Sequence, residues 1–292
     1  MKPQLLVIVG PTASGKSSLG EALALAYDGE IISADSRQVY RGLDLGSGKE
    51  RLKVPQRLID IKDPEERFTV MEWCDRARQE IDELLAAGRL PIIVGGTGLY
   101  VSALLDGYDF APEGDVKLKE SLAAMSTAEL VAELKQTNAP ALEGLDTRNH
   151  RYLERAVEKT RLGWRAPTTS EPLYDALVLL ADWPRPELYA RIDRRLDDRL
   201  RQGLLGEVQG LIKDGVSADW LKRLGLEYRY LTDYLEGRYK SLNEAVERLK
   251  FATHHFARRQ LIWWRRRSAQ MVPQADVKTA KKLVEKWRRV GI

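Results

Sequence analysis

Short apolar runs alternate with amphipathic stretches along the first hundred residues of the chain. Residues 5–9 form one such run, which is too short for a buried helix and stops at Gly10. A continuous apolar run of this length is typical of a fully buried strand in a parallel sheet. Similar runs predict strands at residues 90–94 and 176–181, a strand that ends at Asp35 is expected at residues 30–34, and helical periodicity predicts helices at residues 15–27 and 69–87. Strands that alternate with helices predict right-handed βαβ units and an α/β fold whose parallel sheet is covered on both faces.

The pattern changes in the middle of the chain. Residues from about 112 to 169 are polar with helical periodicity, and they contain no run that resembles a strand. We therefore expect a three-layer α/β core built from residues 1–112 and 173–292, with a helical insertion domain at residues 113–172. Turn-forming sequences at Glu113-Gly114 and at residues 167–170 are the expected borders of this insertion.

Beyond Asp182 the chain is again mostly helical. Ile192, Leu196 and Leu200 recur every four residues and predict an apolar stripe on one helix. The basic residues around and beside this stripe are Arg191, Arg194, Arg195 and Arg199.

Composition excludes several classes of protein. The 292-residue chain has one cysteine, Cys74, which excludes an internal disulfide framework and a cysteine-based metal cluster. It has no run of about 18 apolar residues, so we expect no membrane span. The N-terminus lacks the apolar region and cleavage site of a signal peptide, which predicts a cytoplasmic protein. No heptad pattern or long apolar patch indicates self-association, so we expect a monomer.

The positive charge of the chain is distributed unevenly. The net charge is +4, and the stretch from Arg248 to Arg267 has seven lysines or arginines and no acidic residue. A stretch of one sign attracts a polyanion such as a nucleic acid. A solvated helix face would have the same composition, so charge alone leaves both interpretations open.

The strongest chemical signal follows the first predicted strand. Residues 10–17 read GPTASGKS and fit the pattern G-x-x-x-x-G-K-[ST] between a buried strand and a helix. Glycines let backbone N–H groups turn inward and the helix N-terminus adds positive potential, so the loop predicts phosphate binding. Lys16 supplies a mobile positive charge, and the hydroxyl of Ser17 can hold Mg²⁺. The predicted phosphate-binding residues are Gly10, Pro11, Thr12, Ala13, Ser14, Gly15, Lys16 and Ser17.

Two further polar residues follow predicted strands. Asp35 comes after the second strand, and Thr97 follows the two glycines that end the third. Ligands of open α/β sheets bind at the carboxyl ends of the strands, so both residues should face the phosphate loop across one cleft. Asp35 could hold Mg²⁺, act as a general base or cap a turn. Thr97 could bond a bridging oxygen of the ligand or cap the following helix.

Taken together, these segments resemble the tRNA dimethylallyltransferases. The resemblance includes GPTASGKS, ISADSRQVYRGLDLGSGK, VPQRLIDIKDP and GRLPIIVGGTGLYVSALLDG, and it continues in RIDRRLDDRLRQGLLGEVQGL, YLEGRYKSLNEAVE and ARRQLIWWRRR. It covers nearly the whole chain in the order that is found in the family.

The resemblance implies transfer of a dimethylallyl group from its pyrophosphate to N6 of the adenine 3′ of the anticodon. In that reaction the phosphate loop, Lys16 and Mg²⁺ would neutralise the leaving pyrophosphate. Asp35 would take the proton of the adenine amine, and Thr97 would steady the bridging oxygen. Arg191 and Arg195 are similar to basic residues of the family, and we favour Arg195 as the one that reaches the pyrophosphate, although any single arginine could instead pair with a neighbouring aspartate.

The resemblance also implies how tRNA is bound. The target adenine must leave the anticodon loop stack, so base flipping is expected. The helical insertion is the expected clamp on the anticodon stem-loop, and each expected contact apart from Asp35 could also be an ordinary surface residue. The implied tRNA-binding residues are Asp35, Ser36, Arg37, Gln38, Lys117, Arg151, Tyr152, Leu153, Glu154, Arg155, Tyr228 and Arg229.

The chain departs from the family pattern at three positions. Thr147 lies where the family has a proline-containing turn, and His254 lies where an arginine is common. Glu227 precedes Tyr228, where the family has a glycine that permits close approach of the backbone. All three positions concern expected RNA contacts, and the phosphate loop is unaffected.

Three other functions fit parts of the sequence. A small-molecule or nucleoside kinase would share the phosphate loop and would consume ATP. An isopentenyltransferase acting on free adenine nucleotides would share the whole cleft without needing the insertion or the basic tail. A non-catalytic RNA-binding module would not need an intact donor site.

Overall fold

The structure is a computed structural model that describes residues 2–107, 114–164 and 172–290. The chain divides into two compact units. The core unit comprises Met1–Asp106 and Pro172–Ile292, and the helical unit comprises Gly107–Glu171. Of the borders expected from the sequence, Glu113 and residues 167–170 lie outside the described residues.

A six-stranded sheet forms the centre of the core unit. All its neighbouring strands pair in parallel, in the order β3-β2-β4-β1-β5-β6, and this confirms the predicted α/β fold with a parallel sheet. The strands are β1 (Gln4–Val9), β2 (Gly29–Ser33), β3 (Gln56–Arg57), β4 (Leu90–Gly95), β5 (Asp175–Asp182) and β6 (Gln270–Pro273). The two edge strands, β3 and β6, were not predicted, because they are short and mostly polar or exposed.

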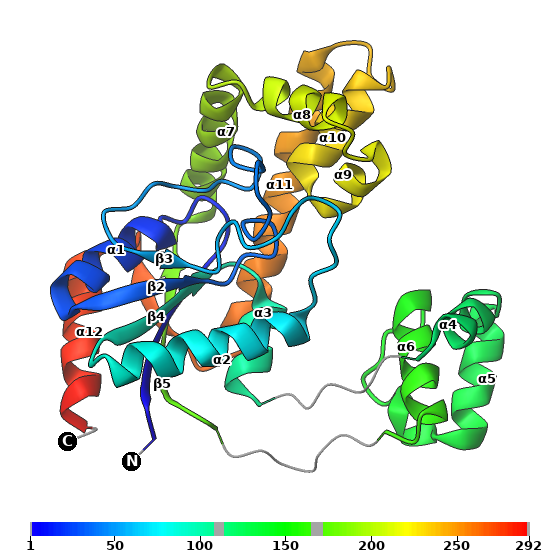
Figure 1. Cartoon of the computed structure of the whole chain (residues 1–292), viewed down its shortest axis with the longest axis horizontal. Helices are drawn as coiled ribbons and strands as arrows, with labels where there is room; N and C mark the ends of the chain where they lie inside the picture. The colour runs from blue at the N-terminus through cyan, green and yellow to red at the C-terminus, as the bar shows by residue number, and fades with distance from the viewer. Residues whose placement is uncertain (1, 108–113, 165–171, 291–292) are drawn as a thin grey trace. The chain divides into compact units, whose positions relative to one another are not determined.

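Helices cover both faces of the sheet and complete the three layers (Figure 1). On one face, α1 (Lys16–Tyr27) and α12 (Val277–Val290) pack against alternate side chains of the strands, such as Ile8 and Ile92. On the other face lie α2 (Val70–Ala86) and α3 (Gly98–Leu105). Trp73 of α2 is fully buried, donates its ring N–H to the backbone oxygen of Ser33 (2.9 Å) and stacks on Tyr100 of α3. Successive side chains of a strand point to opposite faces of the sheet, so the apolar strands contact both helical layers.

The remaining helices of the core unit gather beyond the carboxyl edge of the sheet. They are α7 (Arg185–Arg201), α8 (Leu204–Lys213), α9 (Ala218–Leu224), α10 (Leu226–Leu235) and α11 (Leu242–Arg265). Buried Tyr228 lies in their shared apolar core and donates its hydroxyl to Glu207 (2.8 Å). The same carboxylate accepts the backbone N–H groups of Asp44, Leu45 and Gly46. Glu207 thus ties the long loop after β2 to the helices.

The helical unit has an apolar core of its own. It contains α4 (Val116–Ala123), α5 (Thr127–Thr137), the 3₁₀ turn Ala139–Leu142 and α6 (His150–Arg161). Leu122, Leu130, Leu134, Leu153 and Val157 are buried together between these helices. Ser126 and Glu129 form a capping box at the start of α5, so the local sequence specifies where that helix begins. Within the described parts of both units, no helix is long and apolar enough to span a membrane.

Replacing Trp73 with phenylalanine tests the link between α2 and the sheet. The change keeps an aromatic ring but leaves the backbone oxygen of Ser33 without its donor. We expect the free energy of unfolding, measured by urea denaturation, to fall by about 1–3 kcal/mol. Met71→Ala on the exposed face of the same helix should change it by less than about 0.5 kcal/mol. Equal losses in the two variants would contradict this role for Trp73.

Candidate active site

The loop between β1 and α1 has the backbone of a phosphate-binding loop. Ala13 and Gly15 adopt positive φ angles of 63° and 83°, and α1 begins directly after them at Lys16. At Gly10 a Cβ atom would lie 2.8 Å from the backbone oxygen of Ala181, so the close approach of β5 requires glycine there. The first N–H groups of α1 lack partners within the helix, and together with the positive end of the helix they favour an anion.

Side chains from distant parts of the core unit hold this loop in place. Gln260 of α11 accepts the N–H of Thr12 (2.9 Å) and donates to the backbone oxygen of Gly96 (3.0 Å), so it bridges the two glycine-containing loops. Trp183 donates its ring N–H to the oxygen of Ser14 (2.8 Å). Arg191 donates to the oxygen of Ala13 (2.9 Å) and lies over the ring of Trp183. Gln260 and Trp183 were not predicted as site residues, because no local sequence pattern connects them to residues 10–17.

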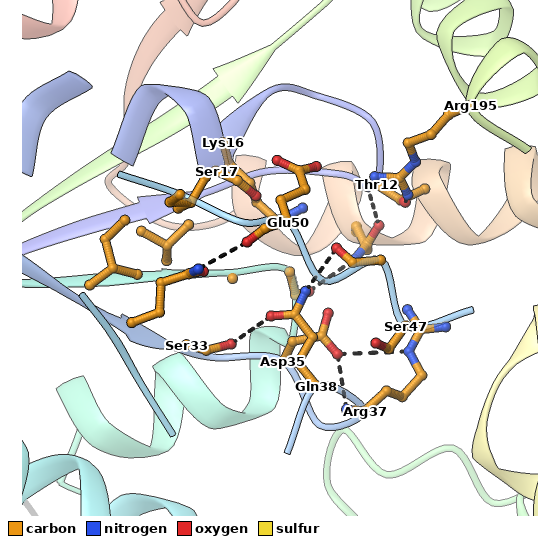
Figure 2. A pocket seen from close by; sticks show the side chains of 18 of the residues that line it. Thr12, Lys16, Ser17, Ser33, Asp35, Arg37, Gln38, Ser47, Glu50 and Arg195 are labelled. Atoms are coloured by element: carbon orange, nitrogen blue, oxygen red, sulfur yellow. Dashed lines mark hydrogen bonds and ion pairs between the residues drawn. The ribbon is translucent and has the colours of Figure 1, made fainter. Parts of the chain in front are cut away.

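One cavity, here called the phosphate cleft, lies beside the loop. Figure 2 shows side chains of Lys16, Ser17, Asp35, Arg37 and Arg195 around it. Further lining residues include Thr12, Gln38, Ser47, Glu50, Gly96, Glu227 and Gln260. The structure therefore brings Asp35 and the phosphate loop together across one cleft, and it adds Glu50, Glu227 and Gln260 to the residues expected from the sequence.

Positive charge is concentrated in the phosphate cleft. Burial and the neighbouring Arg195 lower the pKa of Lys16 to about 8. Burial and Arg199 likewise lower the pKa of Arg195 to about 10. Arg195 donates to the hydroxyl of Thr12, which places its guanidinium next to the loop. These cations destabilise one another, so a bound anion would stabilise the cluster.

Asp35 lies on the side of the cleft formed by the loop after β2. One oxygen of its carboxylate accepts the backbone N–H of Arg37 (2.9 Å), which confirms the turn-forming role considered for it. Gln38 accepts from the hydroxyl of Ser33 (2.9 Å) and donates to the backbone oxygen of Gly48 (3.1 Å). The Asp35 carboxylate is therefore held at the wall of the cleft by local backbone structure.

A second cavity, here called the side opening, shares Asp35 with the phosphate cleft. It is lined by Asp35, Ser36, Arg37, Gly96, Thr97, Lys222, Arg223, Leu224, Gly225, Leu226, Arg229, Phe256, Arg259 and Gln260. The hydroxyl of Thr97 accepts the N–H of Ser36 (3.4 Å), so it ties the loop after β2 to the start of α3. Arg229 and Arg259 are exposed at this opening.

The oxygen groups in the phosphate cleft suit a divalent cation whose other ligands are water molecules and substrate oxygens. The Ser17 hydroxyl and the carboxylates of Asp35 and Glu50 line the same cavity. Among the residues that the structure describes, no cluster of three or more His, Cys, Asp or Glu side chains could hold a metal. Mg²⁺ is usually bound through one or two protein groups, waters and phosphate oxygens, so these residues fit such a site.

Two of the expected RNA-binding residues are buried. Tyr228 is fully buried with its hydroxyl on Glu207, and Leu153 is fully buried in the core of the helical unit. Neither side chain can contact RNA in this structure, because packing against neighbouring helices covers both. The sequence pattern did not indicate this burial, because polar or charged residues flank both positions.

The other expected residues of the helical unit lie on its helices. Lys117 is exposed on α4, and Arg151 and Tyr152 are exposed on α6. Glu154 contacts His150 (3.3 Å), and Arg155 pairs with the buried carboxylate of Glu158. Residue Thr147, one of the departures, lies in the turn before α6.

Comparison with known proteins identifies the family. The IPP transferase family model matches residues 38–267, and the isopentenyl transferase model matches residues 3–59. The chain belongs to the IPP transferase family. The tRNA dimethylallyltransferase 1 of Trichlorobacter lovleyi is 43% identical to it over 286 residues, which cover 91% of this chain and 92% of that protein.

Solved structures of IPP transferases agree with this assignment. The tRNA isopentenylpyrophosphate transferase of Bacillus halodurans is 34% identical, with a TM-score of 0.74 over 99% of this chain and 96% of that one. The tRNA delta(2)-isopentenylpyrophosphate transferase of Staphylococcus epidermidis is 30% identical, with a TM-score of 0.71 over 99% of both chains. The resemblance stated from the sequence is therefore confirmed.

The pKa of Lys16 predicts how anion binding depends on pH. Its ammonium group loses its proton as the pH rises through about 8. We therefore expect inorganic pyrophosphate, followed by isothermal titration calorimetry, to bind roughly tenfold more weakly at pH 9 than at pH 7. Lys16→Arg stays charged over this range and is the matched control. A wild type that follows the same pH dependence as Lys16→Arg would contradict the assignment.

Proposed function

We propose that the protein transfers a dimethylallyl group from dimethylallyl pyrophosphate to N6 of the adenine 3′ of the anticodon in tRNA. The observation that carries the proposal is the phosphate cleft, where a cationic phosphate loop faces the carboxylate of Asp35. Its relatives support the same reaction, since those described above are named tRNA dimethylallyltransferase or tRNA isopentenylpyrophosphate transferase.

On the donor side, the phosphate loop holds the pyrophosphate group. The backbone of residues 10–17, Lys16 and Arg195 meet the charge that develops when the allylic C1–O bond breaks. Arg191 holds the loop through its bond to Ala13 and lines a cavity with Lys16 and Ser17, where it adds a further positive charge for the donor. The hydroxyl of Ser17 would hold Mg²⁺, which would supply further charge neutralisation to the leaving group.

On the acceptor side, Asp35 takes the proton of the adenine amine. The N6–C1 bond forms as the C1–O bond breaks, and pyrophosphate leaves with its negative charge. Asp35 is the carboxylate that lines both the phosphate cleft and the side opening, so it lies where a base entering from that opening would meet the donor. Thr97 lies at the same opening, and its hydroxyl steadies the bridging oxygen.

tRNA binds at the side opening and on the helical unit. Arg229 and Arg259 are exposed at the opening and provide contacts for phosphates next to the flipped adenine. Ser36, Arg37 and Gln38 line the path of the base. The helical unit clamps the anticodon stem-loop through exposed Lys117, Arg151 and Tyr152, with Glu154 and Arg155 beside them on α6. We further propose a cytoplasmic monomer.

A labelled-donor assay tests the reaction directly. Wild-type protein with labelled dimethylallyl pyrophosphate, Mg²⁺ and unmodified tRNA should transfer label to the tRNA. Asp35→Asn should lower the rate by roughly 10²–10⁴-fold, because the acceptor loses its base. Asp75→Asn on the exposed face of α2 is the matched control and should transfer at the wild-type rate.

The same assay separates the alternatives. Label in AMP or ADP, with none in tRNA, would assign the protein to free adenine nucleotides. Consumption of ATP with some acceptor and no transfer of label would indicate a kinase. Transfer by Asp35→Asn at the wild-type rate would remove Asp35 from the reaction.

Metal dependence provides a separate test of Ser17. Chelation of divalent ions with EDTA should abolish transfer, and added Mg²⁺ should restore it. Ser17→Ala should need roughly tenfold more Mg²⁺ for half-maximal rate, because one protein ligand is lost. Ser18→Ala, an adjacent and exposed serine, should keep the wild-type requirement. An unchanged Mg²⁺ requirement in Ser17→Ala would show that this hydroxyl does not hold the metal.

A further inference from the structure

A carboxylate lies buried among the arginines of the phosphate cleft. Glu227, near the start of α10, has a side chain that is 9% exposed. One of its oxygens accepts from the guanidinium of Arg37 at 3.0 Å, and the other lies 3.8 Å from the guanidinium of Arg199. Glu227 is also the residue that departs from the family pattern next to Tyr228.

The backbone around these arginines is shaped to receive them. A Cβ atom at Gly225 would lie 2.8 Å from a guanidinium nitrogen of Arg37 and 2.9 Å from its Cδ. A Cβ atom at Gly48 would lie 1.8 Å from a guanidinium nitrogen of Arg199. Glycine thus allows close approach at position 225, two residues before Glu227, and the carboxylate occupies the space between the two arginines.

Arg37 lies between two carboxylates with unequal contacts. It donates to Glu227 at 3.0 Å, whereas its nearest side-chain nitrogen is 3.7 Å from the Asp35 oxygen that already accepts its backbone N–H. Burial disfavours the charge of Arg37, but Glu227 and Asp35 outweigh that effect and raise its pKa, so the guanidinium stays charged. Without Glu227, Coulomb attraction would draw this buried cation toward Asp35.

We propose that Glu227 is a positioning residue for the transfer reaction, because it holds the Arg37 guanidinium away from close pairing with Asp35. The Asp35 carboxylate then remains able to accept the proton of the adenine amine. The ion pair of Glu227 with Arg199 holds the Glu227 carboxylate from the opposite side, so this carboxylate does not move with Arg37. The inference rests on the proposed function, since Asp35 is the proton acceptor there.

Steady-state kinetics of Glu227→Gln test this role. Glutamine keeps the shape of the side chain but loses the charge that competes for Arg37. We expect kcat to fall by roughly 10–100-fold, as for a small displacement of a reacting group. The KM values for dimethylallyl pyrophosphate and for tRNA should stay within about threefold, because the phosphate loop and the exposed arginines at the side opening are unchanged.

The effect of Glu227→Gln in an Arg37→Gln variant tests whether Glu227 acts through Arg37. In an Arg37→Gln variant no guanidinium can close on Asp35, so adding Glu227→Gln should change kcat by less than about threefold. Asp233→Asn is the matched control, since it removes another buried carboxylate of α10 whose ion-pair partner is Arg238 (3.4 Å). This control should keep the wild-type kcat.

Each outcome decides between a positioning role and a structural one. A Glu227→Gln variant with a lower melting temperature and wild-type kcat would overturn the proposal, and so would an equal loss of kcat in both backgrounds. If Glu227→Gln does not fold, Glu227→Asp keeps the charge and should lose less than about tenfold in kcat; a larger loss would overturn the proposal. Absence of transfer by the wild type would reject the proposed function itself, a result distinct from all of these.

Discussion

The balance of charge at the carboxyl edge of the sheet is the constraint on which the rest of the structure depends. Lys16, Arg37 and Arg195 come from three separate elements and line one cavity, and Arg199 is buried near Arg195 and Glu227. Each loses hydration there, and such losses are tolerated only with fixed partners nearby. Glu227 supplies one partner, and an anionic ligand would supply another. Helices α7 and α10 both contribute to this balance, since α7 brings Arg195 to the phosphate loop and α10 brings Glu227 to Arg37 and Arg199.

Neutral polar groups hold the phosphate loop alongside Arg191 and Arg195. The amide of Gln260 connects the loop to Gly96, and the indole of Trp183 fixes the backbone oxygen of Ser14. These bonds use groups whose charge does not change with pH or with the ligand. The loop can therefore keep the same shape when pyrophosphate replaces the water inside it and the local charge changes. Rigid donors that need no rearrangement are the basis of electrostatic stabilisation of a leaving group.

The sequence predicted those features whose signal is local. Strands β1, β4 and β5 contain continuous apolar runs, and the phosphate loop is a contiguous pattern between a strand and a helix. Asp35 and Thr97 were expected in one region because parallel strands end at the same edge.

Strands β3 and β6 were missed, because neighbouring strands rather than their own side chains determine their pairing. Gln260 and Glu227 were missed as site residues for a similar reason: they act about 164 and 190 residues away from their partners. Tyr228 stands between charged neighbours, so only the packing of α8, α10 and α11 reveals its burial. The chemical roles of Asp35, Thr97 and the arginines stay predictions.

The place of the helical unit in the chain also affects the order in which the sheet is made. Strand β1 lies between β4 and β5, but β5 begins 80 residues after β4 ends (175 minus 95). A ribosome that adds about 5–20 residues per second needs roughly 4–16 s to cover this distance. During that time one edge of an almost entirely apolar strand has no partner, which is the type of edge that invites pairing with another chain. The apolar core of the helical unit consists only of residues of that unit, so the unit can fold before β5 is synthesised and pairs with β1. Nascent protein, rather than the finished enzyme, is therefore the form most exposed to aggregation.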